Sequence, residues 1–240
     1  MILYIKHIDI EGPETIQDFF EAHGFTSSIV EMGVNEKLPE NLKSIDAVVS
    51  MGGPMNVYEE DKYPFLKMET EFIRAVLSNH IPFLGVCLGS QMLAKVAGGR
   101  VVKSPNEEIG FSTVQLTKEG KEDLLFQGLG DELIVFQWHG DMFHIPSGGN
   151  LLAASSACPH QAIKVGCSAY GLQFHVEVTD RNIREWSESY YPNTKEGRLK
   201  IKSMLDDYKR NKKDFLKAQQ TIYNNFLKVI TIRKQILLPK

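Results

Sequence analysis

Short apolar runs rich in β-branched residues alternate with longer helix-patterned stretches over the first hundred residues of this chain. The expected strands cover residues 2–8, 27–32, 46–53 and 82–87, and the expected helices cover residues 14–23, 65–79 and 90–97. This alternation predicts an α/β fold with a doubly wound, mostly parallel sheet and helices on both faces. Ligands of such sheets bind at the carboxyl ends of the strands, so the residues that follow the strands are the first candidates for a functional site.

The second half of the chain is richer in strands and ends in a long helical pattern. Turn residues separate strand-like runs at 111–117, 132–139, 150–156, 161–168 and 169–178. A helix is expected over 180–191, and apolar residues then recur at three- and four-residue intervals from Ile201 to Ile230. We predict a main domain over 1–191 and a basic, amphipathic helical tail over 192–240. Polar residues interrupt the apolar stripe between Tyr208 and Phe215, which indicates a kink or two helices.

Charge is distributed unevenly along the chain. The 240 residues carry 27 Lys and Arg against 30 Asp and Glu, a balance that argues against a nucleic-acid-binding protein. Residues 195–240, however, hold 13 basic and 4 acidic side chains. A basic amphipathic tail suits an anionic surface, a partner protein or the acidic body of its own chain. We expect packing within the chain or in a homo-oligomer, because the body carries the complementary charge.

The sequence carries no signal for export, membrane insertion or metal binding. The N-terminus lacks the pattern of a signal peptide, and no run of about 18 apolar residues occurs. The three cysteines, Cys87, Cys158 and Cys167, have no CxxC spacing, and His139 and His144 form no paired ligand spacing with Cys158. We therefore expect a cytoplasmic protein without disulfides, without a metal site and away from membranes.

The segment P-F-L-G-V-C-L-G-S-Q, residues 82–91, carries the strongest chemical signal. An apolar strand runs into Gly-x-Cys-x-Gly and then into a helix, which is the nucleophile-elbow pattern with sulfur in place of oxygen. The sharp turn needs small residues at Gly85 and Gly89, and the helix N-terminus favours the thiolate of Cys87. Cys87 is therefore a candidate nucleophile, and a buried core cysteine between chance glycines is the alternative.

Two further segments could complete a site around Cys87. In His175-Val176-Glu177, at the end of a strand-like run, residues i and i+2 point to one face, so Glu177 can orient the imidazole toward the cysteine. In Gly52-Gly53-Pro54, after another strand, a backbone N–H can face a reacting carbonyl oxygen, and Leu88 would supply a second N–H. A solvated charge pair and a plain turn are the respective alternatives.

Together these motifs resemble the class I glutamine amidotransferases, most closely the free-standing, GMP-synthase-like members. The resemblance covers residues 1 to about 190 and includes the segments Trp138-His-Gly-Asp141 and Glu108-Ile-Gly110. The family usually has His-Pro-Glu where this chain has Val176 in the middle. The resemblance implies a flavodoxin-like core and a cysteine that attacks the side-chain amide of glutamine, with no metal or organic cofactor.

Carried over to this chain, the resemblance assigns a role to each motif. Cys87 would be the nucleophile, His175 the general base and acid, and Glu177 the residue that orients His175. Gly53 and Leu88 would form the oxyanion hole. The glutamine would be contacted by Gly52 and Gln91 and by a loop of His139, Gly140 and Asp141.

Three functions fit this interpretation. The first is a glutaminase or amidotransferase that releases ammonia to a separate synthase subunit, since the 63 residues after Glu177 leave no room for a fused synthetase domain. The second is a γ-glutamyl peptidase that cleaves the same amide when its nitrogen carries a larger group. The third is a non-catalytic binding or regulatory protein with the same fold.

Overall fold

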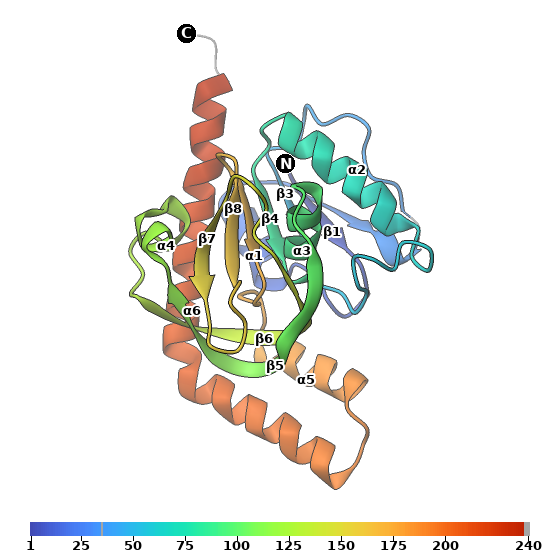
Figure 1. The fold of residues 1–240 in the computed structure, drawn as a ribbon, viewed down its shortest axis with the longest axis vertical. Coiled ribbons are helices and arrows are strands. Elements are labelled where there is room, and N and C mark those ends of the chain that lie inside the picture. Colours follow the sequence, from blue (N-terminus) through green and yellow to red (C-terminus); the bar gives the residue numbers. More distant parts are fainter. Residues whose placement is uncertain (35, 238–240) are drawn as a thin grey trace.

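The computed structural model describes residues 1–34 and 36–237 and has helices packed on both faces of one curled sheet (Figure 1). Within these residues the sheet has nine strands in the order β2-β1-β3-β4-β9-β8-β7-β5-β6. The strands are β1 (Ile2–Lys6), β2 (Ser27–Glu31), β3 (Ala47–Ser50), β4 (Phe83–Val86), β5 (Val101–Leu116), β6 (Glu132–Phe143), β7 (Gly149–Ala154), β8 (Ala162–Val165) and β9 (Ala169–Leu172).

The helices carry most of the connections. They are α1 (Glu14–Ala22), α2 (Phe65–Ser78), α3 (Leu88–Val96), α4 (Lys118–Glu122), α5 (Asp180–Tyr190) and α6 (Lys195–Leu237), with 3₁₀ turns η1 (Met32–Val34) and η2 (Leu124–Phe126). None of the helices among the described residues is long and apolar enough to cross a lipid bilayer.

The sheet is parallel in one half and antiparallel in the other. Strands β2, β1, β3, β4 and β9 pair in parallel, and β9, β8, β7, β5 and β6 pair antiparallel. The predicted α/β class with helices on both faces is confirmed, while the parallel pairing covers only the first half of the sheet. The antiparallel half curls round, so that Phe136 of β6 forms a bridge with His175, just beyond β9.

Strand β1 shows how the sheet separates two cores. Ile2 and Tyr4 point to the face that α1 and α6 cover, and Leu3 and Ile5 point to the face that α2 and α3 cover. Successive side chains of a strand point to opposite faces, so a strand buried on both sides must be apolar throughout. This arrangement explains why the apolar runs near the N-terminus are continuous rather than alternating.

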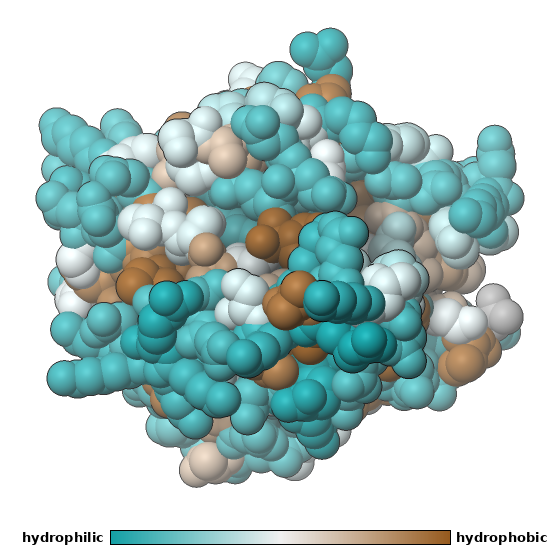
Figure 2. All heavy atoms as spheres, turned by 90° about the horizontal axis from the view of Figure 1, so that it is seen from below, coloured by the Kyte–Doolittle hydropathy of each residue, from teal (hydrophilic) through white to brown (hydrophobic). Residues whose placement is uncertain are grey.

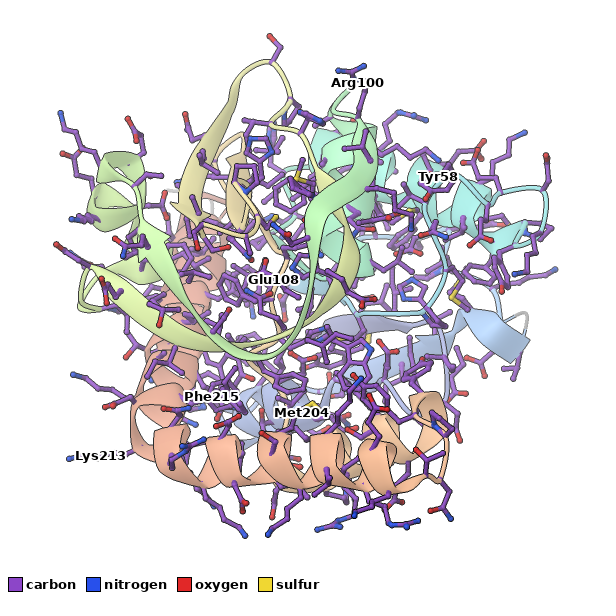
Figure 3. All side chains as sticks on the ribbon, turned by 60° about the horizontal axis from the view of Figure 1, so that its bottom comes forward. Tyr58, Arg100, Glu108, Met204, Lys213 and Phe215 are labelled. Atoms are coloured by element: carbon purple, nitrogen blue, oxygen red, sulfur yellow. The ribbon has the colours of Figure 1, made fainter. Side chains whose placement is uncertain are left out.

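Helix α6 continues from Lys195 to Leu237 and bends near Lys213, which points outward at the bend (Figure 3). The bend confirms the predicted interruption of the apolar stripe. Before it, Met204 and Phe215 flank a cluster with residues of α5 and β6, and after it Phe226 joins the core under α1. Figure 2 shows a largely hydrophilic surface on the side of the molecule that carries α5 and the first half of α6, so the apolar side of this segment faces inward.

The helix packs against its own chain, as predicted, but charge is not the main reason. Among the ion pairs of α6 in residues 195–237, only Lys234–Asp46, at 3.0 Å, joins the helix to the body. The others lie within α6 itself. Burial of apolar side chains therefore holds the helix in place, because exposed ion pairs contribute little to stability.

We expect Phe226→Ala to lower the free energy of unfolding by about 3–5 kcal/mol, as truncations of fully buried aromatic residues do. Phe226 is fully buried and meets the ring of Phe20 edge-on, with ring centroids 6.1 Å apart. Urea unfolding measures the loss, and Lys217→Ala on the exposed side of α6 is the control. Equal, small losses in both variants would mean that α6 is not part of the cooperative core.

Candidate active site

Cys87 lies in the turn between β4 and α3, at the carboxyl end of the parallel half of the sheet. Its backbone has φ 49° and ψ −105°, a conformation that residues other than glycine rarely adopt. A Cβ atom at Gly85 would lie 2.4 Å from the Gly89 backbone, and one at Gly89 would lie 2.2 Å from the carbonyl oxygen of Ser50. The turn therefore requires both glycines, which is the reason that the elbow pattern predicts.

His175 and Glu177 do not lie on a strand, so the expected strand geometry is wrong for these residues. Strand β9 ends at Leu172, and the backbone of His175 pairs instead with Phe136 of β6. The His175 N–H donates to the Phe136 carbonyl at 2.8 Å, and the Phe136 N–H donates back at 3.3 Å. The curl of the sheet thus fixes the histidine through a strand far away in the sequence.

A short hydrogen bond nevertheless joins the two side chains. Nδ1 of His175 lies 2.6 Å from Oε1 of Glu177, and each side chain is 1% exposed. Burial alone would lower the pKa of His175, but the charge of Glu177 and hydrogen bonds to Cys87 and Glu177 raise it well above its ordinary value. A buried imidazolium next to a thiol favours the thiolate.

Val176 strengthens this arrangement at the position where the family usually has proline. Its backbone N–H donates to Oε2 of Glu177 at 2.9 Å. Proline has no N–H, so a His-Pro-Glu segment could not make this bond. In this chain both carboxylate oxygens of Glu177 are therefore hydrogen-bonded.

Helix α6 supports the same segment from behind. Nε2 of Gln219 donates to the Val176 carbonyl oxygen at 2.5 Å, and the Tyr223 hydroxyl donates to the same oxygen at 3.3 Å. Thr15 donates to the carbonyl oxygen of Glu177 at 2.8 Å. No sequence pattern connects the tail with the His–Glu pair, because these contacts span more than 40 residues.

Gln219→Ala should destabilise the protein by about 1–3 kcal/mol, since it removes a donor from a buried carbonyl group. We also expect kcat to fall more than KM rises, because the loop that carries His175 loosens while the pocket keeps its lining. Gln220→Ala, on the exposed side of the same helix turn, is the control. Steady-state kinetics and urea unfolding of both variants test this, and an unchanged kcat in Gln219→Ala would contradict it.

The turn after β3 is anchored by a buried histidine. The Nδ1 atom of His7 lies 2.9 Å from the carbonyl oxygen of Gly52 and donates to it. In a trans peptide the C=O and the following N–H point in opposite directions, so the N–H of Gly53 faces away from His7. Leu88 is the first residue of α3, so its N–H has no acceptor within the helix.

His7 itself is held by a buried carboxylate. Its Nε2 atom lies 2.7 Å from Oε2 of Glu69, and Ser50 donates to Oε1 at 2.6 Å. Burial lowers the pKa of His7, but the charge and hydrogen bond of Glu69 outweigh burial, so the net shift is upward. Both ring nitrogens then donate. The sequence does hold one signal for this pair, because Glu69 falls on the apolar face of its helix, between Leu66 and Ile73.

A pocket of about 150 Å³ opens above Cys87. Six predicted site residues line it, namely Gly53, Cys87, Gln91, His139, Gly140 and Asp141. The other four, Gly52, Leu88, His175 and Glu177, are not among the lining residues of the described chain. His139, Gly140 and Asp141 belong to strand β6 rather than to the expected loop, because β5 pairs with this segment.

Hydrogen bonds fix the pocket wall opposite Cys87. Nε2 of Gln91 donates to the carbonyl oxygen of Asp141 at 3.2 Å. The Tyr58 hydroxyl donates to Oδ2 of Asp141 at 2.8 Å, and Lys103 pairs with Oδ1 at 2.7 Å. Tyr58, which is 54% exposed, therefore connects the turn after β3 with β6 (Figure 3).

Glu11 is a pocket residue that the sequence did not reveal, because a glutamate before Gly12-Pro13 has no distinctive pattern. Its Oε1 atom accepts a hydrogen bond from Tyr190 at 3.1 Å, and burial raises its pKa. A Cβ atom at Gly52 would lie 2.5 Å from Oε2 of Glu11 and 3.0 Å from Cε1 of His175. Gly52 therefore makes room for a carboxyl group directly beside the His175 ring.

A flavodoxin-like sheet with a cysteine elbow next to a buried His–Glu pair defines a class of enzymes built for nucleophilic attack by sulfur. The comparisons with known proteins narrow this class. Residues 13–185 match the class-I glutamine amidotransferase family, and the chain belongs to that family.

Its relatives include proteins of more than one kind. A putative glutamine amidotransferase-like protein, YfeJ, of Salmonella typhimurium is 32% identical over 179 residues, covering 73% of this chain and 75% of its own. The amidotransferase-like component of a glutamine-hydrolysing GMP synthase from Sulfolobus acidocaldarius, which is named as one of its subunits, is 37% identical and covers 60% of this chain and 73% of its own. The crystal structure of a glutamine amidotransferase from Thermotoga maritima superposes with a TM-score of 0.86 at 35% identity, covering 95% of this chain and 97% of that one.

Proposed function

We propose that this protein hydrolyses the side-chain amide of glutamine through a thioester on Cys87, giving glutamate and ammonia. The observation that carries the proposal is the buried His175–Glu177 pair in hydrogen-bond contact with Cys87, at the base of a small pocket. Membership of the amidotransferase family supports the same chemistry.

The reaction needs two proton transfers, and His175 is placed for both. The Cys87 thiolate adds to the amide carbon, and the carbonyl electron pair moves to the oxygen. The C–N bond then breaks as the protonated His175 donates its proton to the departing nitrogen, which leaves as ammonia. A water molecule next loses a proton to His175 and attacks the thioester, so that glutamate leaves and the thiolate returns.

Backbone and carboxyl groups around Cys87 would bind the rest of the substrate. The N–H groups of Gly53 and Leu88 would stabilise the oxyanion, because one points away from the His7 anchor and the other has no helical acceptor. Glu11 offers a carboxyl group on the pocket wall for the α-ammonium group of glutamine. Gln91 positions the wall through Asp141.

The released ammonia has a synthase partner as its expected acceptor. The relative from Sulfolobus acidocaldarius is named as one subunit of a GMP synthase rather than as the whole enzyme. This relationship supports delivery of ammonia in trans, to a second protein that would supply the activated acceptor. Glutamine is then the substrate, and the cytoplasm is the compartment in which we expect the pair to work.

The test is to incubate the protein with glutamine and, separately, with γ-glutamyl dipeptides, while ammonia and free amino acids are measured. We expect ammonia from glutamine, together with labelling of Cys87 by a glutamine-mimicking electrophile. Cleavage of dipeptides without ammonia release from glutamine would replace the proposal with a γ-glutamyl peptidase. Inertness to both substrates with no labelling of Cys87 would support a non-catalytic protein.

A further inference from the structure

Three potential metal-ligating side chains meet behind the pocket wall, apart from Cys87. They are Glu108 of β5, His139 of β6 and Cys158 of the turn between β7 and β8. All three are buried, and one ligand atom from each lies within 4.8 Å of the other two. Figure 3 shows Glu108 inside the curve formed by β5 and β6. The three residues come from separate segments, which is why sequence spacing pointed away from a metal site.

The hydrogen bonding of His139 leaves one ring nitrogen without a partner. Its Nδ1 atom lies 3.0 Å from the carbonyl oxygen of Asp141. A carbonyl oxygen only accepts, so Nδ1 carries the proton and Nε2 of the neutral ring presents a lone pair. Nε2 lies 3.2 Å from Oε2 of Glu108, yet no hydrogen-bond partner for this buried atom exists among the described residues. A lone pair that faces a carboxylate oxygen at this distance is repulsive unless a cation lies between the two atoms.

The groups around the cluster already orient its members. Gln161 donates to Oε2 of Glu108 at 2.7 Å, and Ser155 lies 3.3 Å from Oε1. The hydroxyl of Ser155 also accepts the Cys158 N–H at 2.9 Å. Metal-binding histidines and carboxylates typically have such outer hydrogen bonds, and the histidine typically donates its second N–H to a carbonyl oxygen. The bond from His139 to Asp141 has this form.

We propose that Glu108, His139 and Cys158 bind one zinc ion through a carboxylate oxygen, Nε2 and Sγ. Thiolate and imidazole ligands select zinc over magnesium and calcium, which take oxygen ligands. The thiolate and the carboxylate together balance the two positive charges, which offsets the cost of burying the ion. Binding releases the Cys158 proton to solvent. The ion would fasten β5, β6 and the 155–161 turn together, which makes its role structural.

The experiment is to strip the full-length protein with a chelator, titrate it with Zn²⁺ and measure bound metal by atomic emission. We expect one equivalent in the wild type and in Cys167→Ser, whose cysteine is exposed and outside the cluster. Cys158→Ser should lose stoichiometric binding, and Ser155→Ala should bind about 10- to 100-fold more weakly. Co²⁺ in place of zinc should show a thiolate-to-metal absorption band in the wild type and none in Cys158→Ser.

Thermal unfolding provides a second measurement that does not depend on catalysis. Zn²⁺ should raise the unfolding temperature of the wild type and Cys167→Ser, but not of Cys158→Ser. If Cys158→Ser fails to fold, Ser155→Ala and the neutral Glu108→Gln carry the comparison. The proposal is overturned if the wild type binds no stoichiometric zinc, or if Cys158→Ser binds it equally well. In either case the cluster holds a proton instead, as an imidazolium–carboxylate pair.

Discussion

Cys87→Ala should reduce ammonia release from glutamine to the background rate, a loss on the order of 10⁴-fold or more, as for other catalytic nucleophiles. The variant removes the only sulfur that the pocket lining of the described residues contains besides Met55. No neighbouring group can replace it, because the thioester requires a nucleophile at the elbow. Initial rates of ammonia release give the loss, and mass spectrometry of quenched enzyme shows whether a glutamyl adduct of the wild type is absent from the variant.

The control is Cys167→Ala, which changes an exposed cysteine next to β9 and should leave the rate unchanged. Cys87→Ala should also lower the pKa of His175. Burial disfavours the imidazolium, and one of the contributions that oppose burial, the hydrogen bond and charge of Cys87, is gone in the variant. NMR titration of the His175 ring measures the change. Ammonia release at the wild-type rate from Cys87→Ala would rule out the thioester.

Features of the fold and site that depend on neighbouring residues were predictable from the sequence. The elbow is one case, because Gly85 and Gly89 are needed by atoms within a few residues or on the adjoining strand. The bend of α6 is another, because the apolar stripe is interrupted at the same positions. Period and turn chemistry are local properties, and local sequence carries them.

Features that depend on how distant segments meet were not predictable. His175 was expected on a strand, but its position comes from a bridge to Phe136, which forms only when the antiparallel half of the sheet curls round. Helix α6 was expected to dock by charge, but it docks by apolar packing and reaches Val176 through Gln219. The pair of His7 and Glu69 joins the end of β1 to α2, and neither residue has a motif.

We expect His7→Phe to lower kcat about 10²- to 10³-fold, the loss seen when an oxyanion-hole donor is removed, with a much smaller change in KM. Phenylalanine fills a similar space but cannot donate to the Gly52 carbonyl oxygen. The Gly52–Gly53 peptide is then free to rotate, and the N–H of Gly53 loses its fixed direction. Stability should also fall, by about 3–5 kcal/mol, because Glu69 is left as a buried charge without its partner.

Glu69→Gln separates these two effects. The neutral amide can still accept a hydrogen bond from Nε2 or from Ser50, and His7 can keep the proton on Nδ1 that holds Gly52. This variant should therefore lose stability while it retains most of the wild-type kcat. Urea unfolding and steady-state kinetics on both variants give the comparison, and equal losses of kcat would assign His7 a structural role only.

The pH dependence of stability provides an independent check on the same pair. Because the pKa of folded His7 is raised, its contribution to stability is fully present below the unfolded value, about pH 6.5, and is lost as the pH rises through the folded value. His7→Phe and Glu69→Gln should both flatten this part of the profile relative to the wild type, although only His7→Phe loses the anchor on Gly52. A wild-type profile in both variants would show that His7 is not charged in the folded protein, and the stability lost in His7→Phe would then come from packing alone.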